Sequence, residues 1–180
     1  MFSFSKVLAF GLVAFSSVRA VPFMQTSCII DIGTSVGPAH AFNVPNPNEV
    51  YKIVNVATNT AVQAFGQDSV VGMEIKDQFP PYFAHWQLIR ATQGGGFKIR
   101  SVAFGTIFTG NDKLFTGFSR PSEAFTVESA GEDQFIIKEV NSDQDWTVEY
   151  DREGHQILKL APSKGKEHKE QKWRFVPVGN

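Results

Sequence analysis

The chain has almost no cysteine. Among its 180 residues only Cys28 carries a thiol. A single cysteine cannot form an internal disulfide, so the fold cannot depend on covalent cross-links. The apolar neighbours Ile29 and Ile30 predict a buried, unreactive thiol. Stability must therefore come from the packing of apolar side chains.

The chain also lacks an excess of charge of either sign. Lys and Arg number 17 and Asp and Glu number 18, which gives a net charge of −1. Nucleic acids and anionic membranes are bound through clusters of positive charge. We therefore expect neither of them as a partner.

Recognisable catalytic and metal-binding patterns are missing as well. The four histidines stand at 40, 85, 155 and 168, and none is spaced as a metal ligand with another histidine or cysteine. The sequence has no H-E-x-x-H pattern, and its G-x-S-x-G string at 33–37 lies outside the strand-turn-helix pattern of a nucleophile elbow. Gly94-Gly95-Gly96 lacks the spacing of a phosphate-binding loop. The sequence predicts a protein that is not an enzyme and that needs no metal ion or cofactor.

Only one stretch is apolar over many residues, and it lies at the N-terminus. Val7 to Phe15 follows Lys6 and is followed by Val18-Arg19-Ala20. A basic residue, a short apolar core and small residues at the end are typical of a secretory signal peptide. The run is too short to cross a bilayer. We expect residues 1–20 to be removed near Ala20 and the protein to be secreted.

Residues 21–49 show no periodic pattern. They contain Gly33, Gly37, Pro38, Pro45 and Pro47, which are residues typical of loops. We expect a partly irregular N-terminal extension here. The remaining residues, 50–180, suffice for one domain with a real core.

What is present is a threefold repeat. Three segments share the pattern aromatic-x-Ile-x-polar, which predicts half-buried strands. Each is followed by a second aromatic residue. The opening anchors lie 46 and 38 residues apart and the closing ones 39 and 48, and a period of that length indicates a repeat architecture. The opening segments are Tyr51-Lys52-Ile53, Phe97-Lys98-Ile99 and Phe135-Ile136-Ile137, and the closing residues are Trp86, Phe125 and Trp173.

These repeats predict an all-β fold made of three units of four short strands. One core should contain Ile53, Trp86, Ile99, Phe125, Ile137 and Trp173. The expected strands are 50–56, 60–65, 70–76 and 84–90; 97–102, 105–109, 113–118 and 124–129; and 134–140, 145–150, 155–161 and 171–177.

From Val50 to Val178 the chain resembles small fungal β-trefoils. Tyr51-Lys52-Ile53 and Trp173-Arg174-Phe175 carry this resemblance, together with the last pair of strands. It implies a pseudo-threefold barrel, which we expect to be monomeric. Two branches are similar: the ricin-B-like lectins, and the mushroom protease inhibitors of the cospin and mycocypin kind.

The lectin branch implies an Asp in the second strand of each unit and a Q-x-W in the fourth. Gln63 and Thr109 stand at the Asp positions of the first two units, and Glu149 stands there in the third. The Gln of Q-x-W is kept only as Gln171. Glu149 and Gln171 are therefore the only candidates for a sugar site, and a weak one, and Gln171 is also expected to bond backbone between strands.

The inhibitor branch requires only a rigid, exposed loop on a stable scaffold. The resemblance to cospin-like inhibitors places that loop between the second and third strands. This loop has no Lys or Arg for the acidic pocket of trypsin. Its residues are Gly66, Gln67, Asp68, Ser69 and Val70.

A second candidate loop is Ser163-Lys164-Gly165, which offers a lysine. We expect the glycine to make it flexible, so that a protease would cut it more readily than be inhibited by it. The sequence thus favours a secreted inhibitor of serine proteases, with cysteine proteases as a second target class. The alternatives are a carbohydrate-binding module with degenerate sites and a trefoil that has kept neither activity.

Overall fold

The computed structural model describes residues 44–47, 49–92 and 94–179. The expected signal peptide (1–20), Cys28 and most of the N-terminal extension (21–49) lie outside the described residues.

Twelve strands and two short 3-10 helices make up the described chain, and each strand overlaps one of the twelve predicted from the sequence. The two helical turns occupy the starts of two predicted fourth strands. The elements are β1 (Val50–Asn55), β2 (Val62–Ala64), β3 (Val71–Met73), η1 (Pro81–Ala84), β4 (Trp86–Arg90), β5 (Phe97–Ser101), β6 (Gly105–Gly110), β7 (Lys113–Gly117), β8 (Phe125–Gly131), β9 (Gln134–Glu139), β10 (Gln144–Tyr150), β11 (Gln156–Pro162), η2 (Lys169–Gln171) and β12 (Trp173–Pro177).

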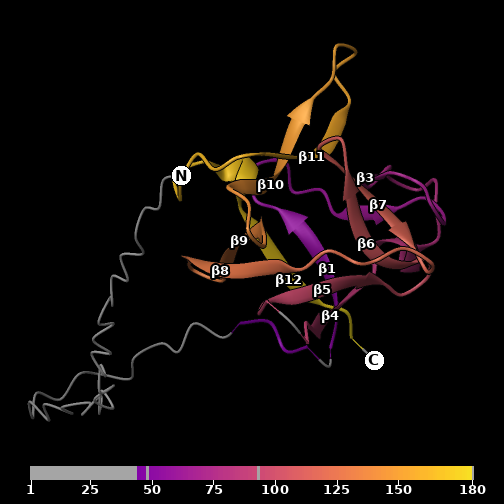
Figure 1. The fold of residues 1–180 in the computed structure, drawn as a ribbon. Coiled ribbons are helices and arrows are strands. Elements are labelled where there is room, and N and C mark those ends of the chain that lie inside the picture. The colour runs from indigo at the N-terminus through magenta and orange to yellow at the C-terminus, as the bar shows by residue number, and fades with distance from the viewer. Residues whose placement is uncertain (1–43, 48, 93, 180) are drawn as a thin grey trace, which may run out of the picture. The chain divides into compact units, whose positions relative to one another are not determined.

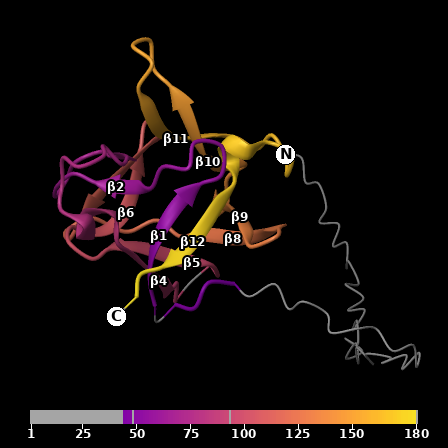
Figure 2. The ribbon, with the colours of Figure 1, turned by 180° about the vertical axis from the view of Figure 1, so that it is seen from behind.

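Six of the strands close into a barrel. Antiparallel pairing runs from β1 to β4, β5, β8, β9 and β12, and returns from β12 to β1. The other six strands form three hairpins, β2–β3, β6–β7 and β10–β11. Figures 1 and 2 show the β10–β11 hairpin rising from the body of the domain. The predicted arrangement of three four-stranded units is confirmed.

The core is formed as the alternation of the sequence predicts. All six predicted core residues are buried and belong to one apolar cluster. Trp146 of β10 joins them, with its ring edge-on to Phe125 at 5.4 Å and to Trp173 at 6.0 Å. Aromatic side chains bury much apolar area each, so this cluster supplies stability that a disulfide-free domain needs.

An indole hydrogen bond occurs in the first and third units, and a backbone hydrogen bond replaces it in the second. The indole N–H of Trp86 donates to the carbonyl of Val62 at 2.9 Å, and that of Trp173 donates to Trp146 at 3.0 Å. Phe125 has no such donor, and in its unit the backbone N–H of Glu123 donates to Ile107 instead. Each fourth strand is thereby tied to the second strand of its own unit.

Two tight turns share the left-handed backbone conformation. The β6–β7 turn is Asn111-Asp112, with φ of 51° and 59°, as expected for a two-residue hairpin turn. The β8–β9 turn places Glu132 and Asp133 at 44° and 59°. Asp and Asn tolerate this left-handed region better than most residues.

Candidate functional site

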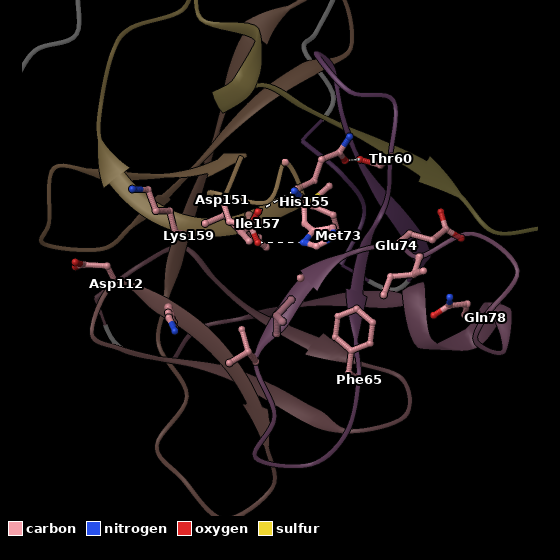
Figure 3. A pocket seen from close by; sticks show the side chains of 18 of the residues that line it. Thr60, Phe65, Met73, Glu74, Gln78, Asp112, Asp151, His155, Ile157 and Lys159 are labelled. Carbon is pink, nitrogen blue, oxygen red and sulfur yellow. Dashed lines mark hydrogen bonds and ion pairs between the residues drawn. The ribbon is translucent and has the colours of Figure 1, made fainter. Parts of the chain in front are cut away.

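A cavity of about 1100 Å³ opens among the three hairpins. Its walls come from β3 and the segment after it, from the β6–β7 turn, and from the β10–β11 hairpin. Figure 3 shows Phe65, Glu74 and Gln78 on one side and Asp112 and Lys159 on the other. A volume of this order accommodates a ligand of small-molecule size.

An aromatic ring is fixed in the wall of the cavity. The half-buried Phe65 packs edge-on against Phe79 at 5.2 Å, and Phe79 stacks on Phe83 at 5.8 Å. Gly72 lets the ring lie close over β3, because a Cβ there would sit 3.0 Å from Cε2 of Phe65. The ring is therefore held in place before any ligand arrives.

Carboxylates share this cavity with the ring. Those of Glu74 and Asp112 take part in no ion pair or hydrogen bond with the part of the chain that the structure describes, although both residues bond through their backbone. Asp151 differs, because its carboxylate accepts the backbone N–H groups of His155 at 2.9 Å and Glu153 at 2.8 Å. The bond from His155, followed by that from Glu153, lowers the pKa of Asp151. Asp151 thus shapes the hairpin turn, while Glu74 and Asp112 remain available.

The sugar-site candidates from the sequence are engaged with other groups of the chain. Gln171 is fully buried, and its amide bonds the backbone N–H of Lys164, the hydroxyl of Thr147 and the carbonyl of Pro162. Glu149 pairs with Lys159 at 2.8 Å, and no hydrogen bond joins it to Gln171 in the described chain. The structural role expected for Gln171 is confirmed, and no side of its amide faces solvent.

The positions equivalent to the lectin Asp are likewise occupied in the first two units. Gln63 is buried and accepts the backbone N–H of Ile75 at 3.1 Å. Thr109 donates its hydroxyl to Glu139 at 2.9 Å. Both side chains are thus bonded within the chain, and neither supplies the carboxylate of the lectin pattern.

The loop Gly66–Val70 is docked against β7. Asp68 donates its N–H to the carbonyl of Thr116 at 2.6 Å, and Thr116 donates its own N–H to Ser69 at 3.2 Å. The Thr116 hydroxyl donates to the carbonyl of Gly66 at 2.7 Å. The loop is thus rigid, but three of its peptide groups are used inside the molecule, and Val70 lines the cavity.

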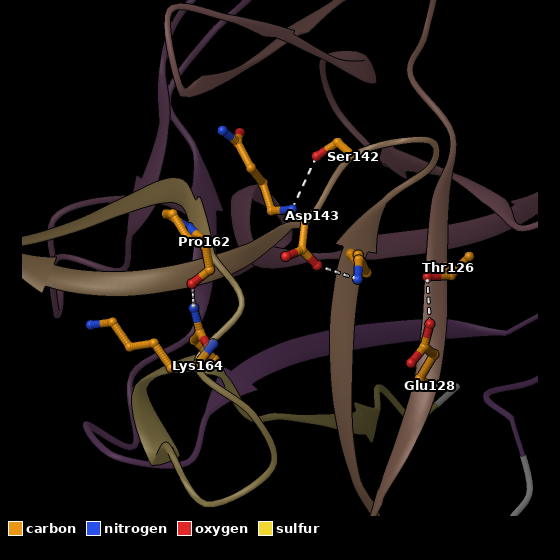
Figure 4. A network of polar contacts seen from close by, with 9 residues as sticks. Thr126, Glu128, Ser142, Asp143, Pro162 and Lys164 are labelled. Atoms are coloured by element: carbon orange, nitrogen blue, oxygen red, sulfur yellow. Dashed lines mark hydrogen bonds and ion pairs between the residues drawn. The ribbon is translucent and has the colours of Figure 1, made fainter.

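The loop after β11 has a different kind of support. Residues 162–170 are all exposed, and buried Gln171 bonds the backbone on both sides of Ser163 (Figure 4). Ser163 itself donates its N–H to the carbonyl of Asp143 at 3.0 Å. The structure therefore differs from the expectation of a flexible loop. Gly165, with φ of 88°, lies after the braced residues.

In the described part of the chain no group of three or more His, Cys, Asp and Glu side chains could hold a metal ion. Nor does that part contain a helix long and apolar enough to cross a membrane.

Comparison with known proteins relates the chain to solved structures only by its fold. No family model and no curated protein matches it. A ricin B-like lectin from Macrolepiota procera, in complex with lactose, superimposes with a TM-score of 0.56 at 15% identity over 74% of this chain and 99% of that one. The designed threefold-symmetric protein ThreeFoil gives 0.56 at 16% identity over 72% and 99%. The fold is a β-trefoil.

The structure of Cry35Ab1 is also similar. That chain matches with a TM-score of 0.61 at 18% identity over 74% of this chain, and this trefoil spans only 37% of its length. Identities this low establish the fold alone. The cavity described above lies where the three hairpins of the trefoil meet.

Proposed function

We propose that this β-trefoil binds carbohydrate in the cavity among its hairpins. One observation carries the proposal: the fixed ring of Phe65 shares the cavity with the unpaired carboxylates of Glu74 and Asp112. The fold is compatible with it, since one similar structure is a lectin in complex with lactose and another, SeviL, is bound to an asialo-GM1 saccharide.

The chemistry of the walls matches that of a sugar. A sugar ring has an apolar face of C–H groups that can pack on an aromatic side chain, and a rim of hydroxyl donors. Ionised carboxylates accept such donors in charge-assisted hydrogen bonds. Because Phe65 is already held by Phe79, little conformational entropy is lost when a ligand binds.

This site differs from the repeat sites of the lectin pattern. Gln63, Thr109 and Glu149 stand where that pattern has Asp, and all three are bonded within the chain. The proposal therefore places a single site at the hairpins and none in the individual repeats.

A glycan array followed by calorimetric titration with lactose tests this. Phe65→Leu removes the aromatic face and Asp112→Asn removes one charge at constant shape, and each should weaken binding by about tenfold, the equivalent of 1.4 kcal/mol. Asp133→Asn is the matched control, because Asp133 occupies a turn with the same φ of 59° away from the cavity. An array without any bound glycan, or binding unaffected by both changes, contradicts the proposal.

A second function, inhibition of a trypsin-like serine protease, is favoured by the loop after β11. Lys164 is exposed, and the buried amide of Gln171 fixes the backbone before and at this residue. Preorganised loops bind proteases tightly because they lose little entropy on docking. This ranks Lys164 above the loop Gly66–Val70, whose peptide groups already bond to β7.

Residual activity of trypsin, chymotrypsin, subtilisin and papain in the presence of the protein tests this second function and its protease class. Lys164→Ala should abolish inhibition of trypsin, whereas Lys164→Arg should retain it and Lys166→Ala should leave it unchanged. Gln171→Met should turn the inhibitor into a substrate that is cut after Lys164. Inhibition that instead vanishes when Gln67, Asp68 and Ser69 are replaced by alanine would assign it to the first loop.

We also propose that residues 1–20 direct secretion. If they do, the N-terminal residue of the protein recovered from culture medium is Val21.

A further inference from the structure

We propose that a second cavity, at the other end of the barrel, binds a small organic cation such as a quaternary ammonium group. This cavity has a volume of about 490 Å³. It lies at the starts of β1 and β9 and the end of β12, whereas β1 and β9 lead away from it toward the hairpins. It shares no lining residue with the cavity among the hairpins.

The charges around this cavity have one sign. Its lining includes the carboxylates of Glu49 and Asp133, and among the residues that the structure describes the lining contains no Lys, Arg or His. The cavity among the hairpins is different, since its lining includes Lys76, Lys113 and Lys159 beside the acids. A ligand that enters the smaller cavity therefore meets two negative charges with no lining cation to balance them, which favours a positive ligand.

Three aromatic rings line the cavity, together with Val44, Pro45 and Pro177. Phe175 is half-buried and lies edge-on to Tyr51 at 5.7 Å and to Phe135 at 5.5 Å. The face of an aromatic ring carries negative potential, and it attracts a cation held within about 6 Å of its centre. Ring faces beside carboxylates form the kind of site that recognises alkylated ammonium groups.

Hydrogen bonds fix the position of one carboxylate. The hydroxyl of Tyr51 donates to Oε2 of Glu49 at 2.9 Å and accepts the backbone N–H of Asn46 at 2.7 Å. Burial and then the bond to Glu49 raise the pKa of Tyr51 to about 12, so the phenol stays neutral and keeps its proton. Tyr51 therefore remains a hydrogen-bond donor to the Glu49 side chain over the physiological pH range.

The size of the cavity limits the ligand. Its volume is in the lower part of the range for small-molecule sites, which suits a trimethylammonium group and its short substituent. The rings of Tyr51 and Phe135 are largely covered by their neighbours, at 4% and 7% exposure, so the half-buried Phe175 is the most exposed ring of the three for a cation to contact.

The test uses the full chain with choline as the probe and 3,3-dimethylbutan-1-ol as its neutral isostere. Chemical shifts in protein NMR spectra follow each titration, with sodium chloride at equal ionic strength as the salt control. Choline should shift the signals of Phe135 and Phe175 in a saturable manner, with a millimolar Kd. The isostere should bind at least about fivefold more weakly, because it lacks the charge.

Variants assign the binding to this cavity. Asp133→Asn and Phe175→Leu should each weaken choline binding by about threefold or more, and Asp112→Asn, in the turn with the same φ, should leave it unchanged. Equal binding of choline and its isostere overturns the proposal, as does the absence of saturable shifts. It is also overturned if both cavity variants bind choline as the unmodified protein does, or if galactose binds here more tightly than choline.

Discussion

At the scale of single residues, the carboxyl group of Asp145 is the least expected feature of the core. It is fully buried on β10, and neither oxygen has a hydrogen-bond partner among the described residues. Burial raises its pKa above the ordinary value of 3.8, and the nearby Ser163 hydroxyl and Lys138 ammonium oppose this only in part. Folding therefore shifts the protonation equilibrium of Asp145 toward its neutral form relative to the unfolded chain.

The pKa shift of Asp145 predicts how stability changes with pH. Below pH 3.8 the group is protonated in both folded and unfolded chains, and its contribution is fully present. As the pH rises, the unfolded chain releases the proton first, so the free energy of unfolding falls until the folded pKa has been passed.

Replacing Asp145 by Asn removes this titration. We expect Asp145→Asn to match the unmodified protein at pH 3 and to exceed it in stability at pH 7, by about 1 kcal/mol or more. Urea unfolding at the two pH values measures the difference. A variant that is less stable at pH 7 would show that the ionised carboxylate is stabilised by the fold.

The role of one residue could be read from the sequence in outline only. The match to Q-x-W placed Gln171 before a core tryptophan and predicted bonds to backbone, which the structure confirms. The sequence could not show that these bonds converge on Lys164. The position of these bonds depends on how the loop after β11 folds back onto η2, and no short-range sequence pattern predicts that position.

At the scale of elements, the start of β6 depends on a glycine. Gly105 has φ of 90°, and a Cβ there would lie 2.4 Å from the carbonyl oxygen of Gly117 on β7. Gly131 at the end of β8 has the same φ of 90°, but a Cβ there would meet nothing within 4 Å. Alanine substitutions at the two positions therefore distinguish the cost of backbone strain from the cost of steric overlap.

We expect Gly131→Ala to cost about 1–2 kcal/mol, the penalty of the left-handed conformation alone. Gly105→Ala should cost at least about 2 kcal/mol more, because the backbone of β7 must also move. Urea unfolding of both variants gives the comparison. Equal losses would mean that β6 and β7 separate without cost.

The strands themselves were predictable because each unit repeats the same alternation around buried anchors such as Ile53 and Trp86. The helical turns η1 and η2 were not predicted. They end one residue before the core residues Trp86 and Trp173, and η2 contains no apolar residue. The alternation that predicts the strands gives no signal for a single helical turn in front of them.

At the scale of the whole molecule, β1 and β12 are neighbours. They pair from Tyr51–Pro177 to Asn55–Trp173, and Val178 donates its N–H to Val50 at 2.8 Å. A chain that starts at Pro121, in the exposed segment between β7 and β8, and joins 178 to 50 by a short glycine-serine linker should therefore fold.

We expect this permuted chain to keep a β-type circular dichroism spectrum and a cooperative thermal transition. A second permuted chain, opened between Arg174 and Phe175 inside β12, is the control and should not fold cooperatively. If both chains fold, the pairing of β12 with β1 and β9 is not needed for the barrel.

Neither cavity could be predicted from the sequence. The cavity among the hairpins is lined by residues from all three units, such as Phe65, Asp112 and Lys159. The smaller cavity is lined by Glu49, Asp133 and Phe175, which are each more than 40 positions apart in the sequence. The repeat predicted that the units meet, but not which side chains their turns leave without partners. The sequence therefore predicted sugar sites within the individual repeats, where the polar side chains instead form hydrogen bonds and ion pairs within the chain.

The closure of the barrel by β12 also has a consequence for biosynthesis. Eleven strands leave the ribosome before β12, and until it arrives β1 and β9 each lack one neighbour. An unpaired edge invites pairing with other chains, and contacts that join distant parts of a sequence form slowly. The newly made chain thus passes through an aggregation-prone intermediate that lacks only β12. The yield of folded protein in a cell therefore depends on the lifetime of that intermediate.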